Sequence, residues 1–376
     1  MERHYGMDWL RIGAFGLLIL YHIGMVFVPW PFHVKTAHPL AWVEIPMFAT
    51  NPWRLTLLFV VSGYASRTLL AKAGSAGSFL LSRSSRLLPP LLVGMAVIVP
   101  PQTWVELTTQ HGYRHGYLPF WLGDYFRFGT IDGIIMPTWN HLWFVVYLWI
   151  YSVVLACTCA ALGRHSLQGW FDRAFAGWRT VVLPAIYFLL LGAVLFPQIE
   201  DTHDLFHDGV AHLRYLPAFL FGFGVARSPL VLASFARHWR VASTASVLCF
   251  ATIATLLVLW PDFTFPETPV VVWTYRFARH LETWTAIAAL IGIAERFWNR
   301  DGRWRATLAE ATFPFYLIHQ TIIVLVGGWL LPFVLGPGTE FAILLLATVA
   351  GCWALYDAGR HVGWLRPLIG LKHRPR

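Results

Sequence analysis

The sequence predicts an all-α membrane protein with about ten transmembrane helices and both termini in the cytoplasm. Of its 376 residues, 57% are hydrophobic and 12% are charged, whereas an ordinary soluble domain has roughly 45–50% apolar and 25% charged residues. Aromatic residues make up 16% of the chain, and their amphipathic rings favour the interface between lipid and water. A water-soluble fold is therefore not expected.

Ten segments are apolar and long enough to cross a hydrocarbon core of roughly 30 Å, which requires about 20 residues per helix. The first resembles a signal peptide, but it continues to Pro29 without a small-residue cleavage site. We therefore expect an uncleaved first span. The ten segments are 8–30, 53–72, 87–106, 139–163, 179–197, 209–227, 240–260, 270–295, 311–333 and 340–358.

The distribution of Lys and Arg predicts the orientation, because cytoplasmic loops carry the excess of these residues. With the N-terminus inside, 21 of the 28 Lys and Arg residues fall on the cytoplasmic side and five on the outer side, while two lie within the membrane. An even number of spans returns the C-terminus to the cytoplasm, where residues 360–376 form a short basic tail. We expect residues 1–376 to form a single integral membrane domain.

Two other classes of site are not indicated by the sequence. The basic residues that give the net charge of +9 lie between apolar segments. Nucleic-acid binding instead requires basic residues gathered on one face of a folded domain. The four cysteines lie in apolar stretches without metal-ligand spacing. The outer loop 200–208 contains His203 and His207, but no strong metal motif accompanies them, so we interpret it as a solvated acidic loop and expect no metal site.

The first predicted helix carries ionisable residues, which are costly in a bilayer unless they are paired or face a polar cavity. Arg11 and His22 are eleven residues apart, close to three helical turns, so both project along one stripe about 16 Å apart. Asp8 lies one turn from Arg11, near the same stripe. His22 is therefore a candidate for catalysis. The alternative is a histidine that hydrogen-bonds a neighbouring helix for packing.

Two arginines, Arg83 and Arg86, lie between the second and third predicted spans. Their i, i+3 spacing places them on one helix face, where they could clamp phosphates through charge-assisted hydrogen bonds. The alternative is ordinary positive-inside charge. Further along the chain, Gly222-Phe223-Gly224 is interpreted as a point of close helix packing and not as a nucleotide-binding loop.

Further candidates for a polar cavity lie on the fourth, eighth and ninth predicted helices. If the fourth and eighth helices surround the first, an outer cavity contains two histidines and a cationic wall, in which Arg279 is close enough to pair with Glu282. His319 is expected nearer the cytoplasmic half. The candidate residues are His141, Arg276, Arg279, His280, Glu282 and His319.

Several of these residues belong to short motifs whose order along the chain is informative. The motifs are Asp8-Trp9-Leu10-Arg11 with His22, Leu58-Phe59-Val60-Val61-Ser62-Gly63-Tyr64, Arg83-x-x-Arg86, His141-Leu142-Trp143-Phe144 and Phe315-Tyr316-Leu317-Ile318-His319-Gln320. Together with the ten-helix plan, they resemble the membrane-bound acyltransferase type 3 family. Within that family, the chain looks most similar to the glucan-biosynthesis members that succinylate periplasmic glucans.

The resemblance implies an enzyme that transfers an acyl group other than an amino-acyl group. The expected donor is cytoplasmic acyl-CoA carrying acetyl or succinyl, and the expected acceptor is a hydroxyl of an envelope glycan or a lipid-linked molecule. The resemblance also implies a multi-pass protein of the bacterial cytoplasmic membrane that contacts membrane lipids, with no tightly bound cofactor and no nucleic-acid partner.

The resemblance implies that His22 and Arg11 are important for catalysis and that Arg83 and Arg86 matter at the cytoplasmic side. One departure concerns the Trp-Ser-Leu-x-x-Glu segment of many members. It reads Trp139-Asn140-His141-Leu142-Trp143-Phe144 here, without glutamate, so any role of that acid is not carried over.

The implied chemistry suits His22 as a general base. An acceptor hydroxyl attacks a thioester slowly unless a base removes its proton, an effect worth roughly 10²–10⁴ in rate. Histidine, with an unperturbed pKa of about 6.5, is mostly neutral near pH 7 and can accept this proton. We assign Arg11, which is too far from His22 to contact the same atom, to the donor or to holding Asp8.

The competing function is a transporter or flippase for an envelope intermediate. Ten helices with charged residues inside the membrane fit that function equally well on physical grounds. A transporter should also show pseudo-symmetric halves with broken helices near the midplane, and the sequence shows no sign of them.

Reporter fusions test the predicted topology. Because 21 Lys and Arg residues lie on one side and five on the other, reporters after residues 120 and 205 should be periplasmic, and reporters after 76, 168, 235, 302 and 376 should be cytoplasmic. A reporter that is active only in the periplasm and one that is active only in the cytoplasm measure this at each position. A periplasmic C-terminus would overturn the orientation.

Overall fold

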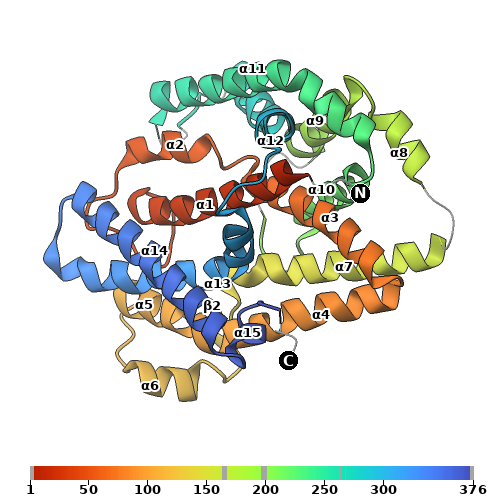
Figure 1. The fold of residues 1–376 in the computed structure, drawn as a ribbon. Coiled ribbons are helices and arrows are strands. Elements are labelled where there is room, and N and C mark those ends of the chain that lie inside the picture. The colour runs from red at the N-terminus through yellow and green to blue at the C-terminus, as the bar shows by residue number, and fades with distance from the viewer. Residues whose placement is uncertain (1–3, 163–166, 196–200, 262–263, 267, 373–376) are drawn as a thin grey trace. The chain divides into compact units, whose positions relative to one another are not determined.

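The computed structural model describes residues 4–162, 167–195, 201–261, 264–266 and 268–372, in which helices dominate (Figure 1). The predicted all-α class is confirmed. The α-helices are α1 (Tyr5–Phe27), α2 (Glu44–Phe48), α3 (Arg54–Ala73), α4 (Ala76–Val93), α5 (Pro100–Gln110), α6 (Tyr117–Pro119), α7 (Trp143–Leu162), α8 (Gln168–Phe175), α9 (Arg179–Leu189), α10 (Gly209–Val225), α11 (Pro229–Leu259), α12 (Pro269–Phe297), α13 (Arg305–Leu330), α14 (Pro337–His361) and α15 (Leu365–Leu368).

Short irregular elements connect or extend these helices. Among the described residues, the wide π-helical turns are η2 (Gly94–Ile98), η3 (Phe120–Asp124) and η5 (Leu190–Leu195). The 3₁₀ turns described there are η1 (Ala41–Val43), η4 (Asn140–Leu142) and η7 (Leu331–Phe333). One antiparallel hairpin, β1 (Gly129–Ile131) with β2 (Ile134–Met136), lies in the long loop before η4.

The described part of every predicted span is mostly helical, but only some of these helices are long and apolar enough to cross a membrane. In the described chain, six segments qualify, and up to seven if α8 and α9–η5, bent by 89°, form one span. Of the others, α10 has 17 residues, and α3 and α12 include several charged residues. A multi-pass membrane protein is supported, whereas ten spans and cytoplasmic termini remain predictions. The six segments are Tyr5–Phe27, Ala76–Gln110, Asn140–Leu162, Pro229–Leu259, Arg305–Phe333 and Pro337–His361.

The predicted arginine pair lies inside a helix and not in front of one. We expected the third span to begin at residue 87, but α4 begins at Ala76 and continues through η2 and α5. Pro89 and Pro90 lie inside α4. Their fixed φ is compatible with a helix, although each removes a backbone donor, and the wide turn of η2 begins at Gly94, four residues after Pro90.

The chain divides into two compact units, each discontinuous in sequence. The first unit comprises Met1–Ala14, Ile45–Leu80 and Ile150–Ala309, and the second comprises Phe15–Glu44, Leu81–Trp149 and Glu310–Arg376. Helix α1 contributes its first part to one unit and the rest to the other. Arg11 therefore belongs to the first unit, whereas His22 belongs to the second.

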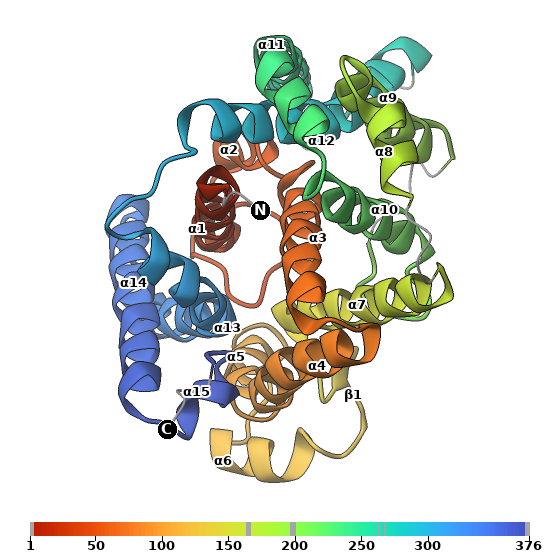
Figure 2. The same cartoon turned by 45° about the vertical axis from the view of Figure 1, so that its right-hand side comes forward.

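Helices α3 and α10 of the first unit lie side by side and approach closely (Figure 2). A Cβ atom on Gly63 would lie 1.8 Å from the carbonyl oxygen of Phe219, and one on Gly222 would lie 1.9 Å from that of Val60. Small residues allow membrane helices to come this close. The interpretation of Gly222-Phe223-Gly224 as a packing point is confirmed.

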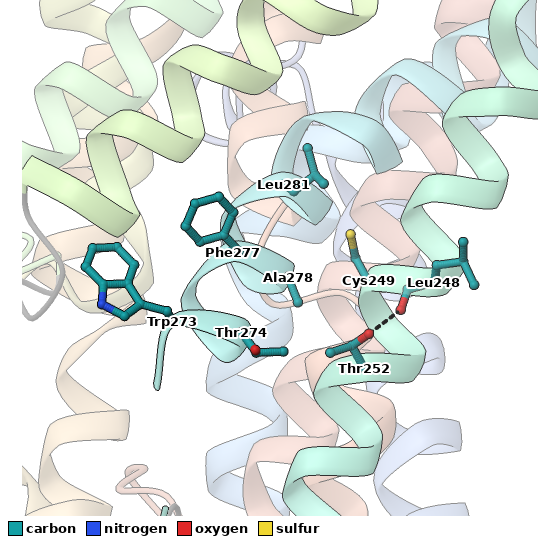
Figure 3. A pocket seen from close by; sticks show the side chains of 8 residues that line it. All are labelled: Leu248, Cys249, Thr252, Trp273, Thr274, Phe277, Ala278 and Leu281. Carbon is teal, nitrogen blue, oxygen red and sulfur yellow. Dashed lines mark hydrogen bonds between the residues drawn. The ribbon is translucent and has the colours of Figure 1, made fainter. Parts of the chain in front are cut away.

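Helices α11 and α12 of the first unit also lie side by side, with an open groove of about 390 Å³ between them (Figure 3). Leu248, Trp273 and Phe277 in its lining are exposed although they are large and apolar, as expected of a surface that contacts lipid. The groove therefore lies on the apolar outer surface of this unit. Its lining is Leu248, Cys249, Thr252, Trp273, Thr274, Phe277, Ala278 and Leu281.

The second unit has a core formed by α1, α5, α13 and α14. A Cβ atom on Gly328 would lie 2.8 Å from Val105 Cγ1, so α13 and α5 are in close contact. This packing holds the second half of α1, which carries His22, against α13, which carries His319. The buried residues of this core include Ile23, Val26, Phe27, Val105, Ile323, Val324 and Leu344.

Gly63→Ala should destabilise the protein by roughly 1–3 kcal/mol or more, because the carbonyl oxygen of Phe219 is part of a helix and cannot move aside as a flexible side chain can. The apparent midpoint of thermal unfolding in detergent measures this change. Gly16→Ala on α1 is the control, since nothing lies within 4 Å of its Cβ position and alanine in a helix interior is about 0.5–1 kcal/mol better than glycine. A Gly63→Ala protein as stable as the wild type would contradict the packing argument.

Candidate active site

His22 and His319 form a hydrogen-bonded pair in the second unit. The Nδ1–H of His319 donates to the carbonyl oxygen of Tyr316 at 2.7 Å, because a carbonyl can only accept. The Nε2 atom of the neutral His319 ring is then an acceptor, and Nδ1–H of His22 donates to it at 2.8 Å. Neutral His22 has one ring proton, so its lone pair is on Nε2. The pair thus fixes one tautomer for each ring.

His141 joins this pair from the turn η4, just before α7. Its Nε2–H donates to the carbonyl oxygen of Leu317 at 3.1 Å, and its ring centroid lies 5.3 Å from that of His319. The rings of His319 and His22 are 5.0 Å apart. The structure therefore brings together three candidates that the sequence placed on three separate helices. The sequence did not pair His319 with His22.

A buried amide network supports this histidine cluster, and the sequence reasoning missed it. Gln102 on α5 donates to the Thr321 hydroxyl at 2.7 Å. Its side-chain oxygen accepts from Gln320 at 3.0 Å and from Asn140 at 3.2 Å. Gln320 and Asn140 are direct sequence neighbours of His319 and His141. An amide residue beside each histidine was therefore the sequence feature that could have indicated this network.

The loop after α1 lies over the same cluster. The ring of Phe32 stacks on that of His22, with centroids 6.2 Å apart and planes 12° apart. Lys35 holds the loop by donating to the carbonyl oxygens of Met25 at 2.6 Å and Trp30 at 2.9 Å. Burial lowers the pKa of Lys35 to about 8, so its ammonium group is mostly protonated near pH 7 and can make these bonds.

Arg11 lies in the first unit, within a cluster of charges near the start of α1. Arg305 Nη1 is 2.7 Å from Asp8 Oδ2, and Arg305 Nε is 2.7 Å from Asp301 Oδ1. Arg11 Nη2 is 3.9 Å from Asp8 Oδ1 and donates to the carbonyl oxygen of Ala309 at 3.2 Å. Arg305, which the sequence did not single out, is therefore the closer partner of Asp8.

Arg83 and Arg86 both lie on α4 in the second unit, as their spacing predicts. The Arg83 side chain is buried, whereas that of Arg86 is half-buried. Between them, Ser84 accepts a hydrogen bond from the indole N–H of Trp149 at 2.9 Å, which ties α4 to α7. The phosphate-binding role of the arginines stays a prediction.

The charged residues of α12 lie in the first unit, and the expected pair between Arg279 and Glu282 does not form there. Arg279 instead donates to the Tyr275 hydroxyl at 3.0 Å and to Asn51 Oδ1 at 3.3 Å. Glu282 is buried, and its Oε2 atom has no hydrogen-bond partner within the described residues. A helix places i and i+3 residues near each other but does not force them to pair, and here Arg279 bonds Tyr275 on the same helix and Asn51 outside it.

The other two α12 candidates also have local partners in the first unit. The His280 ring packs on the backbone at Gly192, where a Cβ atom would lie 2.1 Å from its Cε1. The Arg276 guanidinium lies 5.6 Å from the ring centroid of Trp273. The cavity wall predicted from these residues stays a prediction.

Comparisons with known proteins agree with the resemblance found in the motifs. A family model described as an acyltransferase domain matches residues 4–357. The chain is 23% identical to Glucans biosynthesis protein C of Escherichia coli O157:H7 (strain EC4115 / EHEC), over 99% of this chain and 95% of that protein. The same values hold for the proteins of that name from Escherichia coli O157:H7 and Escherichia coli O81 (strain ED1a). No solved structure matches the chain.

Arg305→Ala should destabilise the protein by roughly 1–3 kcal/mol, because it leaves Asp8 without its closest cationic partner. Chemical denaturation in detergent, followed by tryptophan fluorescence, measures the change. Arg303→Ala is the matched control: Arg303 is exposed, so its loss should change stability by no more than about 0.5 kcal/mol. Equal effects of the two substitutions would show that the Asp8 pair contributes little.

Proposed function

The chain belongs to the acyltransferase type 3 family, and from this premise we propose that it transfers an acetyl or succinyl group from cytoplasmic acyl-CoA to a hydroxyl of an envelope glycan. Family membership and the apolar helices make it a multi-pass membrane acyltransferase. The name of its relatives, Glucans biosynthesis protein C, supports a glycan as acceptor. Their bacterial source together with the apolar helices supports the bacterial cytoplasmic membrane as location. The family match does not favour the transporter alternative.

The observation that carries the proposal is the bond between His22 and His319. Because His319 accepts the Nδ1–H of His22, the lone pair of His22 is directed from Nε2, on the far side of the ring. This arrangement of a base and a partner that fixes its tautomer is the one that activates hydroxyl nucleophiles in acyl transfer. His319 differs from a carboxylate partner in being uncharged, so it orients His22 without adding a negative charge inside the membrane.

The reaction then follows in two steps. The acceptor oxygen attacks the thioester carbonyl carbon while Nε2 of His22 takes the hydroxyl proton, which gives a tetrahedral intermediate and an imidazolium. The intermediate collapses, the C–S bond breaks, and the departing thiolate takes the proton from Nε2. The products are an ester and CoA thiol, and His22 returns to its neutral form without a net change in protons.

The donor is assigned to the cytoplasmic side through Arg83 and Arg86. CoA carries a diphosphate and a further phosphate, and guanidinium groups bind phosphates through charge-assisted, partly bidentate hydrogen bonds. Two arginines on one face of α4 suit this purpose.

Labelled donors test the proposal directly. Membranes that contain the protein are supplied with labelled acetyl-CoA or succinyl-CoA, and the label is followed into the glycan, lipid and protein fractions. We expect label in an alkali-labile ester of the glycan fraction. Label that reaches no fraction above the level of membranes lacking the protein would overturn the proposed reaction.

His22→Gln should lower the transfer rate by at least about 10²–10⁴, because glutamine can hydrogen-bond but cannot take a proton near neutral pH. His22→Ala should be equally inactive, with expression and donor binding near normal. Initial rates of ester formation at saturating donor measure the effect. A His22→Gln protein with most of its activity would show that the residue packs or orients only.

Variants of His319 separate its orienting role from packing. Glutamine at this position offers a carbonyl oxygen that can accept from His22 Nδ1–H, whereas phenylalanine fills the space without an acceptor. His319→Gln should therefore retain more activity than His319→Phe. Loss of a tautomer-fixing partner has cost about 10⁴ in kcat elsewhere, so we expect a large loss for phenylalanine.

Replacing both Arg83 and Arg86 by Gln should raise the donor KM, each lost charge-assisted contact costing roughly 1.5–3 kcal/mol. Lysine should rescue only partly, since it lacks the planar fork of donors. Donor titrations measure KM, and reporter fusions in the same variant check its topology. A double variant that inverts or fails to insert would show that the arginines serve orientation instead.

A further inference from the structure

The chain after α5 turns back and runs alongside the helix that it has just left. We call residues 113–128 the return segment. The indole N–H of Trp104 on α5 donates to the carbonyl oxygen of His115 at 3.1 Å. The indole N–H of Trp121 donates to the carbonyl oxygen of Ala96 at 2.7 Å. Residue numbers thus rise along the segment while those of its partners fall, and both views show α6 beside α5 (Figures 1 and 2).

The partners of the return segment lie deep in the preceding helix. The Tyr125 hydroxyl donates to the carbonyl oxygen of Met95 at 2.8 Å. Met95 is 15 residues before Gln110, the last residue of α5, which corresponds to about 22 Å along a helix. It also lies within residues 87–99, an uninterrupted apolar run of the candidate span Ala76–Gln110. The return segment therefore does not merely cap the end of α5.

Two prolines explain why the carbonyl groups at this level need donors. In η2, the N–H of Val99 donates to the carbonyl oxygen of Gly94, five residues earlier. The next two donors of this pattern would be residues 100 and 101. Both are proline, which has no N–H. The carbonyl groups five residues before them are the two that accept from Trp121 and Tyr125, so the return segment supplies donors that the helix lacks.

The outer face of the return segment is apolar and exposed. Leu118, Leu122 and Phe126 follow one another at intervals of four residues, and their exposed fractions are 61%, 72% and 41%. Leu92 and Val97, which flank the bonded carbonyl groups in sequence, are exposed as well. Large apolar side chains exposed at the same depth on both elements indicate one continuous surface that faces lipid.

The helical part of the return segment, residues 117–124, contains one charged residue, Asp124. Its carboxylate lies 3.2 Å from Arg127 and accepts a hydrogen bond from the Tyr113 hydroxyl at 2.5 Å. Arg127 is exposed, and its long side chain can extend the guanidinium toward the membrane surface. The charge of Asp124 is therefore compensated, as a position within the membrane requires.

We propose that the return segment is re-entrant and lies within the bilayer beside η2, with Leu118, Leu122 and Phe126 against lipid acyl chains. Irregular backbone is tolerated at membrane depth where it packs on protein, and here it also satisfies two carbonyl groups of its neighbour. The proposal does not depend on the reaction that the protein catalyses. A reporter fused after residue 120 replaces the rest of the chain, so it shows on which side α5 ends and not the depth of this segment.

Fluorescence quenching measures the depth of the exposed face. The four native cysteines are replaced by alanine, and Leu122→Cys is labelled with bimane in phosphatidylcholine nanodiscs. The label should lose fluorescence when the acyl chains carry bromine and should keep it when iodide is added to the water. Leu118→Cys, on the same face, gives a second position if the Leu122 variant does not fold.

Two matched positions calibrate this experiment. Leu92→Cys, exposed on α4, should respond to brominated lipid, and His111→Cys, exposed directly after α5, should respond to iodide. A Leu122 label that behaves like the His111 label would place the return segment in water. A Leu122 label quenched by neither agent would show that protein, such as a second copy of the chain, covers the face. Either result would overturn the proposal.

A double-mutant cycle tests the role of the two prolines. Trp121→Phe should lower the apparent midpoint of thermal unfolding, because the carbonyl group of Ala96 loses its donor. The loss should be smaller when Pro100→Ala and Pro101→Ala restore the N–H groups of the helix. Trp104→Phe, which breaks an indole bond to a different carbonyl group, should have the same effect in both backgrounds. An equal loss for Trp121→Phe in both backgrounds would contradict the proposed compensation.

Discussion

Each imidazole of the histidine cluster has one proton and one lone pair to place, and the carbonyl groups of α13 decide where they go. Tyr316 and Leu317 each offer a backbone oxygen whose second lone pair remains after the helical hydrogen bond. These oxygens take the protons of His319 and His141. The proton of His22 then goes to His319, and the proposed chemistry depends on the lone pair of His22 Nε2.

Helix packing has to hold these rings to within a few tenths of an ångström, because a hydrogen bond weakens quickly with distance. In the second unit, Gly328 of α13 lets α5 come close, and α5 supplies Gln102 to the network behind the cluster. In the first unit, Gly63 and Gly222 bring α3 and α10 together in the same way. Packing of small residues does in lipid what the burial of large apolar side chains does in a soluble core.

Charged side chains of the protein lie beside groups that compensate their charge, either an opposite charge or a hydrogen-bonding group. Asp8 pairs with Arg305, and Arg279 bonds Tyr275 and Asn51. Lys35 donates to carbonyl oxygens at the end of α1 and in the loop after it. Among the described residues, the buried atoms His141 Nδ1 and Glu282 Oε2 have no such hydrogen-bond partner. The first lies in the histidine cluster of the second unit, and the second lies on α12 in the first unit.

The sequence by itself determined the all-α class, the multi-pass character and the family, because apolar length and motif order are properties of the chain alone. It also selected His22, His141 and His319, since a polar residue in an apolar segment is visible without coordinates. The tertiary structure alone decided that these three meet, that Arg305 and not Arg11 holds Asp8 most closely, and that Arg279 hydrogen-bonds Asn51 and not Glu282. Such pairings join residues up to 297 positions apart in the chain, and helical periodicity gives the face on which a residue lies but not the helix that packs against it.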